Sequence, residues 1–248
     1  MRAILTYHSI DDSGSPISLP EDVFRRHVEW LAGAGPRVVS IEDLLALPGT
    51  EPAVAITFDD AFVNFADTAW PVLRDHALPV TLYIPTAHAG RTNAWGGHAE
   101  PGIPELPILD WNRLARLMEE GVVPGSHTRT HPRLARLPAN AVQDELESSA
   151  REISSKLGMR PAGLAYPYGS CSAAVAATAA RLFDHACTVD LRPLGARENR
   201  HMLPRLDMHY FRRHGMLESW GRSSLKLYLR ARAGGRRCRT ALNAVRGA

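Results

Sequence analysis

The sequence predicts an α/β fold in which helices cover a parallel β-sheet. Short runs rich in branched or aromatic residues, bounded by Pro, Gly, Asp or Ser, indicate strands, and the segments between them carry apolar residues at the three- and four-residue spacing of helices. The two kinds of segment alternate through most of the chain, as in repeated βα units. Because 45% of the 248 residues are hydrophobic and no linker or repeat interrupts the alternation, we expect one barrel-sized domain.

The expected strands are, in chain order, Ala3–Tyr7, Val38–Ile41, Val54–Phe58, Val80–Ile84, Val122–Val123, Leu164–Tyr166 and Ala186–Val189. The expected helices are Glu21–Ala32, Asp67–His76, Asn112–Glu120, Ala141–Leu157 and Ala173–Phe183. Capping residues support these limits, since Pro20 and Ser40 precede acidic helix starts, and Gly121 and Gly158 follow helix ends. Such units build either an open doubly wound sheet or a closed barrel, and both gather their chemistry at the carboxyl ends of strands.

The composition also bears on location. The apolar run at the N-terminus is short and meets Asp11 almost at once, so it lacks the centre of a secretory signal. The longest uncharged stretch, residues 161–180, contains two prolines and many small residues and is not expected to span a membrane. The three cysteines have neither metal-ligand spacing nor an even number, which favours free thiols in a reducing compartment. We therefore expect a cytoplasmic protein.

The C-terminal part of the chain is strongly basic. Residues 211–248 contain ten Arg or Lys and one acid, a net charge of +9, so the remaining residues together carry −6. We therefore divide the chain into a barrel, residues 1–210, and a basic helical tail, residues 211–248. Residues 224–232 mix apolar and cationic side chains, as helices on anionic membrane surfaces do, although a solvated terminal helix would have the same pattern. We expect a monomer without a nucleic-acid partner, which contacts the inner membrane surface at most peripherally.

Two adjacent carboxylates end the most apolar expected strand. Asp59 and Asp60 follow residues 54–58 and leave the strand end in different directions, so that one carboxylate is placed to bind a metal while the other faces a substrate. Two anions this close repel each other unless a cation lies between them. An Asp-Asp pair is also a common helix cap, so this pattern alone is weak evidence.

Two histidines follow the expected strand at residues 122–123. His127 and His131 are four residues apart, so their imidazoles point the same way if the segment turns helically. Together with Asp60 they form a His-His-Asp set with open positions for water and substrate, which is typical of a catalytic metal site. Such a set suits Zn, Co, Fe or Ni, and we expect a divalent ion, with Zn first.

Three motifs, in this order, resemble the first three motifs of the NodB-like polysaccharide deacetylases, carbohydrate esterase family 4. They are Thr57-Phe58-Asp59-Asp60, Ser126-His127-Thr128-Arg129-Thr130-His131 and Ala165-Tyr166-Pro167-Tyr168-Gly169. The opening Leu5-Thr6-Tyr7-His8-Ser9-Ile10, with Phe24 and Gly35, is similar to the branch that acts on exopolysaccharide N-acetylglucosamine. The resemblance spans roughly residues 3–210, and its motifs are specific in combination.

The resemblance implies a distorted (β/α)7 TIM-like barrel and a role for each motif residue. Asp59 would be the general base, Asp60 with His127 and His131 would bind the metal, and Tyr168 would donate its backbone amide to an oxyanion. The implied reaction is removal of acetyl groups from N-acetylhexosamine units of a polysaccharide or glycan precursor. Two other functions fit the residues: a catalytically silent glycan-binding barrel, and an amidohydrolase acting on a non-sugar acetamide.

The chain departs from the family pattern in two places. Relatives carry an Arg that pairs with the base where this chain has Ala165; Arg205 either replaces it from another strand or is an ordinary surface residue. The motifs also do not identify the histidine that would act as proton donor; His209 is the first candidate and His201 the second. His8 follows the first strand and is placed to reach the barrel mouth, although a histidine there is more commonly just hydrogen-bonded.

Two further features bear on the substrate. Trp111, after Asp110, lies at an expected helix start, where it either stacks on a sugar ring or simply packs. The loop of residues 87–107 contains Trp95-Gly96-Gly97-His98 and is long and rich in Gly and Pro. Long loops on such scaffolds usually shape substrate entry.

Overall fold

A computed structural model of the chain describes residues 1–246, with side chains described as far as residue 235. Its main sheet is parallel and runs in the order β10-β1-β5-β6-β7-β8-β9. These strands are β1 (Ala3–Tyr7), β5 (Ala53–Phe58), β6 (Val80–Ile84), β7 (Val123–Ser126), β8 (Gly163–Ala165), β9 (His185–Cys187) and β10 (Leu206–Asp207). The short β4 (Arg37–Val38) pairs with the start of β5, and β2 (Ser9–Ile10) pairs with β3 (Ser18–Leu19) in a separate sheet.

The two ends of the main sheet are joined by the segment that leads into β10. Leu203 forms a parallel bridge with Cys187 in β9, and three residues later Leu206 pairs with Leu5 in β1. One stretch of chain therefore contacts both edges, and the sheet curls into a distorted barrel. The parallel order and the curvature confirm the predicted fold class.

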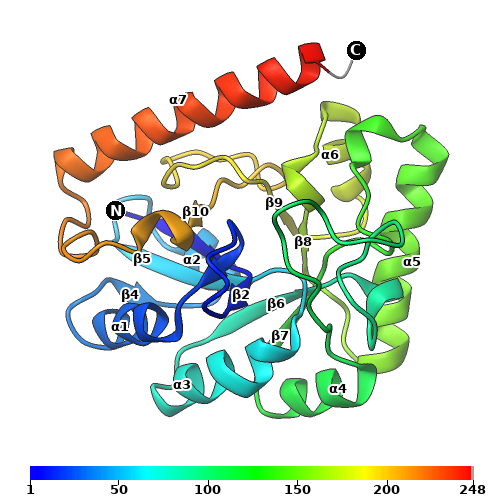
Figure 1. Ribbon diagram of the computed structural model, residues 1–248, viewed down its shortest axis with the longest axis horizontal. Helices are drawn as coiled ribbons and strands as arrows, with labels where there is room; N and C mark the ends of the chain where they lie inside the picture. The colour runs from blue at the N-terminus through cyan, green and yellow to red at the C-terminus, as the bar shows by residue number, and fades with distance from the viewer. Residues whose placement is uncertain (247–248) are drawn as a thin grey trace.

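The helices surround the curled sheet, and the long C-terminal helix runs along one side of the molecule (Figure 1). Their bounds are α1 (Glu21–Ala32), α2 (Ile41–Ala46), α3 (Trp70–Asp75), α4 (Trp111–Glu119), α5 (Ala139–Leu157), α6 (Ala173–Ala179) and α7 (Ser223–Arg246). The Ser40 hydroxyl accepts a hydrogen bond from the Asp43 amide, and Gly158 ends α5 at a φ of 68°. Both caps act as their residue types predict.

The inside of the barrel is filled by a small apolar cluster with one residue from each of several strands. Ile4, Ala55, Tyr83, Ala165 and Cys187 contact one another there and are almost fully buried. Tyr83 is the only aromatic residue among these five, and the small Ala55, Ala165 and Cys187 leave room for its ring. A Cβ on Gly125 in β7 would lie 2.4 Å from the Tyr83 ring, which explains the glycine at this strand position.

Several predicted elements have different limits in the structure. The strand expected at Val38–Ile41 ends at Val38, because Ser40 already caps α2. The helix expected at Asp67–His76 is a π-helical turn, Phe65–Ala69, followed by α3; Pro71 has no amide hydrogen for a regular helical bond at this junction. The strand expected at Val122–Val123 begins at Val123 in the structure and continues to Ser126. It includes Pro124 and Gly125, two residue types that usually interrupt strands.

The remaining differences are smaller. Strands β8 and β9 each begin one residue before their predicted start, and α6 ends at Ala179, short of the expected Phe183. Strands β2, β3 and β10 were not expected, because each has two residues and no recognisable pattern. Cys171 and Cys187 are free, as predicted, and the side chain of Cys238 lies outside the described residues. In the described part of the chain, no helix has the length and apolar character needed to cross a bilayer.

Helix α7 begins against the barrel. Leu225 and Leu229 are buried in the same apolar cluster as β1 and α1, and the Tyr228 hydroxyl donates a hydrogen bond to the Tyr210 carbonyl at 3.1 Å. Next to these anchors Lys226 and Arg230 are exposed, and Leu227 is 68% exposed. The described start of the helix therefore buries one face and leaves a cationic face in solvent.

Candidate active site

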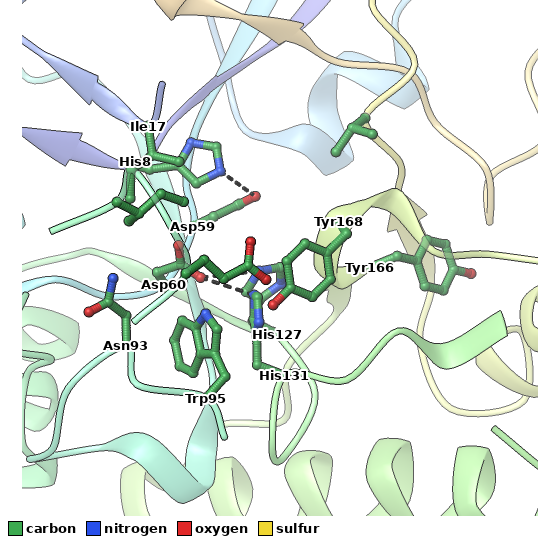
Figure 2. Close-up of a pocket in the computed structure, with 13 residues that line it drawn as sticks. His8, Ile17, Asp59, Asp60, Asn93, Trp95, His127, His131, Tyr166 and Tyr168 are labelled. Carbon is green, nitrogen blue, oxygen red and sulfur yellow. Dashed lines mark ion pairs between the residues drawn. The ribbon is translucent and has the colours of Figure 1, made fainter. Parts of the chain in front are cut away.

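The carboxyl ends of four strands of the main sheet, β1, β5, β7 and β8, bring the predicted site residues together. His8 follows β1, Asp59 and Asp60 follow β5, His127 follows β7, and residue 166 follows β8. Because these strands are parallel and in register, from Tyr7 beside Phe58 to Ser126 beside Leu164, their ends meet at one edge of the sheet. Figure 2 shows His127 and His131 directed toward Asp60, with His8 beside Asp59.

Asp60, His127 and His131 form a compact group that could hold a metal ion. Asp60 Oδ1 lies 3.4 Å from His127 Nε2 and 3.3 Å from His131 Nε2. One ligand atom from each residue lies within 4.8 Å of the others, and all three residues are buried. Burial raises the pKa of Asp60, but the two imidazoles outweigh it and hold this pKa well below its usual value, so the carboxylate is ionised.

The donor chemistry of this group fits a divalent cation. His127 Nδ1 lies 2.8 Å from the Ala165 carbonyl oxygen, an arrangement that assigns the hydrogen of a neutral ring to Nδ1 and leaves a lone pair on Nε2. In that neutral state the lone pair faces a carboxylate oxygen, which is unfavourable unless a positive charge, either a proton or a metal ion, lies between them. Among the described residues, Asp60 Oδ1 and His131 Nδ1 are buried without a hydrogen-bond partner. The carboxylate and the two Nε2 atoms are suitable zinc-type ligands.

Asp59 is held by Arg205 in a buried, two-pronged ion pair. The Arg205 Nη1 and Nη2 atoms donate to Asp59 Oδ1 at 2.6 Å and Oδ2 at 2.7 Å, and Nε donates to the Thr188 carbonyl at 3.0 Å. Arg205 is 1% exposed, so it is a buried partner and not a surface residue. Burial raises the pKa of Asp59, but the charges of Arg205 and His127 and the hydrogen bonds from Arg205 together outweigh it and lower this pKa, keeping the carboxylate ionised.

Three of the predicted site residues have a strained backbone. Asp60, His131 and Tyr168 have φ values of 69°, 61° and 58°, in the left-handed region that non-glycine residues rarely adopt. Thr128, between the two histidines, has a φ of 65°. Each residue in this region raises the conformational free energy of the folded protein by about 1–3 kcal/mol. Such conformations are kept where the surrounding structure fixes them, most often at functional sites. The histidine segment therefore does not form the helical turn that its spacing allows.

A cavity of about 130 Å³ opens directly above these groups. It is lined by His8, Ile17, Asp59, Asp60, Asn93, Trp95, Glu100, Ile103, His127, His131, Tyr166, Tyr168 and Val189. A second hollow of about 410 Å³ adjoins it and shares Trp95, Glu100, His131 and Tyr168 with it. Four residues of the long loop, Asn93, Trp95, Glu100 and Ile103, line the inner cavity. That this loop shapes substrate entry stays a prediction.

The other candidates lie in different places. His8 lines the cavity, with Nε2 3.7 Å from Asp59 Oδ2. His201 Nε2 lies 2.9 Å from the Phe183 carbonyl oxygen, before β9 and so away from the carboxyl ends of the strands. His209 does not line the cavity, and its Nδ1 lies 3.4 Å from the Ser18 carbonyl oxygen.

The two residues at the start of α4 are structural. The Asp110 carboxylate accepts a hydrogen bond from the Arg113 amide as the helix cap. Trp111 is partly buried against the main apolar cluster and does not line the cavity. Of the two predicted roles of Trp111, the structure supports packing.

Sequence reasoning did not single out several cavity residues. Asn93 and Glu100 belong to the loop, and Val189 follows β9; none of them stands in a recognisable motif. Tyr166 belongs to a motif, but its hydroxyl donates to the His201 carbonyl at 3.0 Å, and its ring is turned away from the Asp60 corner (Figure 2). The only signal for the loop residues was the length and composition of the loop itself.

Comparison with known proteins identifies the family. The family model for polysaccharide deacetylases matches residues 46–183. The Bacillus subtilis protein YxkH, whose name places it among polysaccharide deacetylases, is 26% identical over 171 residues, which are 67% of this chain and 56% of that protein. The poly-beta-1,6-N-acetyl-D-glucosamine N-deacetylase of Staphylococcus epidermidis is 25% identical over 165 residues, 61% of this chain and 54% of that protein. The chain thus spans about half the length of these curated relatives.

Solved structures share the fold. The Streptococcus pyogenes deacetylase PplD, in complex with acetate, superposes with a TM-score of 0.70 at 22% identity, covering 83% of this chain and 91% of that one. IcaB from Ammonifex degensii gives a TM-score of 0.70 at 20% identity with the same coverage of both chains. The family model covers more than half of the chain, and the fold agrees with it. The chain belongs to the polysaccharide deacetylase family.

Proposed function

We propose that this protein is a metal-dependent hydrolase that removes acetyl groups from N-acetylhexosamine units of a polysaccharide or glycan precursor. One observation carries the proposal: Asp60, His127 and His131 converge within 4.8 Å of one another, beside the ionised Asp59, at the base of a cavity. A pure binding module has no use for such a group. Family membership and the name of the Staphylococcus epidermidis relative support the reaction and the sugar.

Asp60, His127 and His131 would hold the metal ion, with zinc expected first and cobalt, iron or nickel as alternatives. A divalent ion in such a site supplies Lewis acidity for an amide carbonyl and makes a water molecule easier to deprotonate. The hydrogen bond from His127 to the Ala165 carbonyl fixes the ring so that Nε2 faces the site. Metal analysis of protein purified without chelator would identify the ion.

Asp59 would act as the general base. Arg205 occupies both oxygens in the plane of the carboxylate and holds the group ionised, so Asp59 can take the proton of the attacking water as that water adds to the acetyl carbon. Arg205 thereby fills the role that the resemblance assigns to an Arg at the position of Ala165. The Tyr168 amide is proposed to donate to the oxygen that gains negative charge.

The amine leaving group needs a proton when its bond to the acetyl carbon breaks. His8 is the histidine best placed to supply it, because it lines the cavity with its Nε2 3.7 Å from Asp59 Oδ2. The proton taken up by Asp59 can reach the imidazole at that distance after a small movement, and from there the nitrogen of the substrate. We therefore assign the donor role to His8, ahead of His209 and His201.

The sizes of the two hollows match a sugar that carries an acetamide. The inner cavity of about 130 Å³ has room for the acetamide group, and the outer hollow of about 410 Å³ has room for a sugar ring. Trp95 and Tyr168 border both, and aromatic rings of this kind pack against the apolar faces of sugars. The location of the acetamide at the base of the site would place its carbonyl beside the metal ligands.

The decisive experiment measures acetate release from a panel of N-acetylated glycans and small acetamides, with and without a chelator. Asp59→Asn keeps the shape and the three metal ligands, so it should bind one metal ion per chain and lose about 10²- to 10⁴-fold in turnover. The matched control is Asp110→Asn, which changes an acid in the helix cap outside the cavity and should keep its activity. Unchanged turnover in Asp59→Asn would remove Asp59 from the base role.

The alternatives give different results in the same panel. Tight oligosaccharide binding without any acetate release, at full metal occupancy, would favour a glycan-binding barrel. Release from small non-sugar acetamides but not from glycans would favour the amidohydrolase. Release from N-acetylglucosamine oligomers that a chelator abolishes and added metal restores is the result that the proposal expects.

We also propose that the exposed face of α7 contacts anionic lipid. Lys226 and Arg230 are exposed while Leu225 and Leu229 anchor the helix to the barrel, and Leu227 lies exposed between the cations in the sequence. Cationic side chains beside exposed apolar ones favour binding to anionic membrane surfaces. A position at the inner membrane surface in the cytoplasm remains a prediction from the sequence.

A further inference from the structure

The two metal-binding histidines are held in different ways. His127 has a backbone carbonyl behind its ring, at 2.8 Å from Nδ1. His131 has no such acceptor: its Nδ1 is buried without a hydrogen-bond partner among the described residues. Its backbone, at a φ of 61°, is also in an unfavourable region. Something other than a hydrogen bond must therefore fix the orientation of this imidazole.

Aromatic rings enclose His131 on two sides. The Trp95 indole is stacked on the imidazole, with ring centroids 4.1 Å apart and an angle of 22° between the planes. Tyr168 packs edge-on against the same ring at 4.8 Å and 67°. Figure 2 shows Trp95 and Tyr168 on either side of the His131 ring. The imidazole is thus clamped between a loop residue and a motif residue.

Both sides of this clamp are braced in turn. The His88 ring packs edge-on against Trp95 at 4.8 Å and 86°. The Arg133 guanidinium lies 3.8 Å from the centre of the Tyr168 ring and 4.0 Å from Glu100. Because Trp95 and Glu100 both belong to the loop of residues 87–107, that loop is attached to the histidine segment at two points.

From this arrangement we infer that Trp95 is a positioning residue for the metal ligand His131, and that the loop of residues 87–107 is thereby coupled to metal affinity. The inference rests on the proposed metal site. Partners that orient a metal-binding histidine typically affect affinity by 10- to 100-fold, and they are usually hydrogen-bond acceptors. Here the stacked indole takes that place. It restricts rotation of the imidazole and keeps water from the ring face.

The test measures Co²⁺ affinity directly, through the visible absorption of the bound ion in competition with a chelator. Trp95→Ala should weaken Co²⁺ binding about 10- to 100-fold. Trp95→Phe keeps an aromatic ring and should retain most of the affinity. Arg91→Ala, an exposed change in the same loop outside both hollows, is the matched control and should bind as the unmodified protein does.

The outcomes separate this inference from the proposed function. If the unmodified protein binds no Co²⁺, or if His127→Ala leaves binding intact, the metal site itself is wrong and both proposals fall. If the unmodified protein binds Co²⁺ and Trp95→Ala binds it equally tightly, only the role of Trp95 is overturned. Should the alanine variant fail to fold, Trp95→Leu keeps an apolar side chain without ring stacking and is expected to show the same loss.

Discussion

The buried pair of Asp59 and Arg205 places a full charge of each sign inside the barrel. Arg205 is among the largest side chains that are fully buried, and it also lies 5.7 Å from the centre of the Tyr83 ring. Buried ion pairs add little stability compared with apolar residues, but loss of one partner leaves an uncompensated charge. The pair is therefore best understood as a way of keeping the carboxylate that we propose as the general base ionised and correctly oriented.

Replacement of Arg205 tests this at the residue scale. Arg205→Met should lower the free energy of unfolding by about 3–5 kcal/mol at neutral pH, because Asp59 is left charged and buried. In that variant burial raises the pKa of Asp59, so the loss should shrink as the pH falls and the carboxyl group takes up a proton. Urea unfolding at several pH values measures this loss of unfolding free energy.

The double variant Asp59→Asn with Arg205→Met is the control. With both charges removed it should be more stable than Arg205→Met alone at neutral pH. Equal stability of the single and double variants at every pH would mean that the ion pair is not buried as described.

At the scale of single elements, β7 shows how a strand can depend on one missing side chain. Gly125 lies opposite the Tyr83 ring, which fills the inside of the barrel beside Ala55 and Ala165. The same strand ends at Ser126, immediately before His127, so its position determines where the first histidine lies. A change that pushes β7 away from β6 would also displace this proposed metal ligand.

Gly125→Ala should therefore destabilise the fold by about 1–3 kcal/mol through overpacking, since its Cβ would lie 2.4 Å from a Tyr83 ring carbon. Gly96→Ala, where no atom lies within 4 Å of the added Cβ, should change stability by less than about 0.5 kcal/mol. Thermal or chemical unfolding compares the two. If the two variants were equally stable, the close packing of β7 on Tyr83 would be refuted.

Helix α1 contains a buried histidine that links it to the segment after β10. His27 is 2% exposed, with Nε2 3.2 Å from the Phe211 carbonyl oxygen and Nδ1 3.3 Å from the Tyr7 hydroxyl. Burial lowers the pKa of His27 from 6.5 to about 4. The folded protein therefore keeps this ring neutral over a pH range in which the unfolded chain binds a proton.

The consequence is acid sensitivity of the fold. The unfolded state binds more protons between pH 6.5 and about pH 4, so the contribution of His27 to stability is complete above this range and is lost as the pH falls through it. At about 1.4 kcal/mol per pKa unit, the resulting loss of unfolding free energy is about 3 kcal/mol. His27→Gln should reduce the pH dependence of unfolding by this amount, whereas His76→Gln, at an exposed position, should not. Parallel pH profiles for all three proteins would contradict the assignment.

At the scale of the whole molecule, charge is unevenly distributed. Residues 211–248 carry +9 and the rest of the chain −6. Helix α7 runs along one side of the molecule (Figure 1), and its described start is fixed to the barrel through Leu225 and Leu229. A surface of this kind would bring anionic membranes, and glycans carried on lipids, near the enzyme.

Binding to vesicles tests the membrane proposal. Lys226→Gln with Arg230→Gln should weaken binding to phosphatidylcholine vesicles that contain phosphatidylserine by roughly 30-fold, at about 1 kcal/mol per cation. Binding should also fall with added salt and be weak on pure phosphatidylcholine. Arg136→Gln with Arg181→Gln removes the same charge elsewhere on the surface and serves as control. Equal binding by both double variants would count against α7 as the contact surface.

The fold class, the convergence of Asp60 with His127 and His131, and the adjacent carboxylate of Asp59 were all predictable from local sequence patterns. Alternating periodicity and strand-end motifs are local signals, and Asp59, Asp60, His127, His131 and Tyr168 all stand in such motifs. The structure brings these residues to one edge of the sheet because parallel strands end together. Their chemical roles remain proposals until the variants are measured.

The distant residues that complete the site could be identified only from the three-dimensional fold. Arg205 lies 146 positions from Asp59 in the chain, and no local pattern distinguishes it from an exposed arginine. Trp95 reaches His131 from a loop, and two-residue strands such as β10 form only because the barrel closes around them. Periodicity encodes which face of an element is buried, whereas contacts between elements depend on how the whole sheet curls.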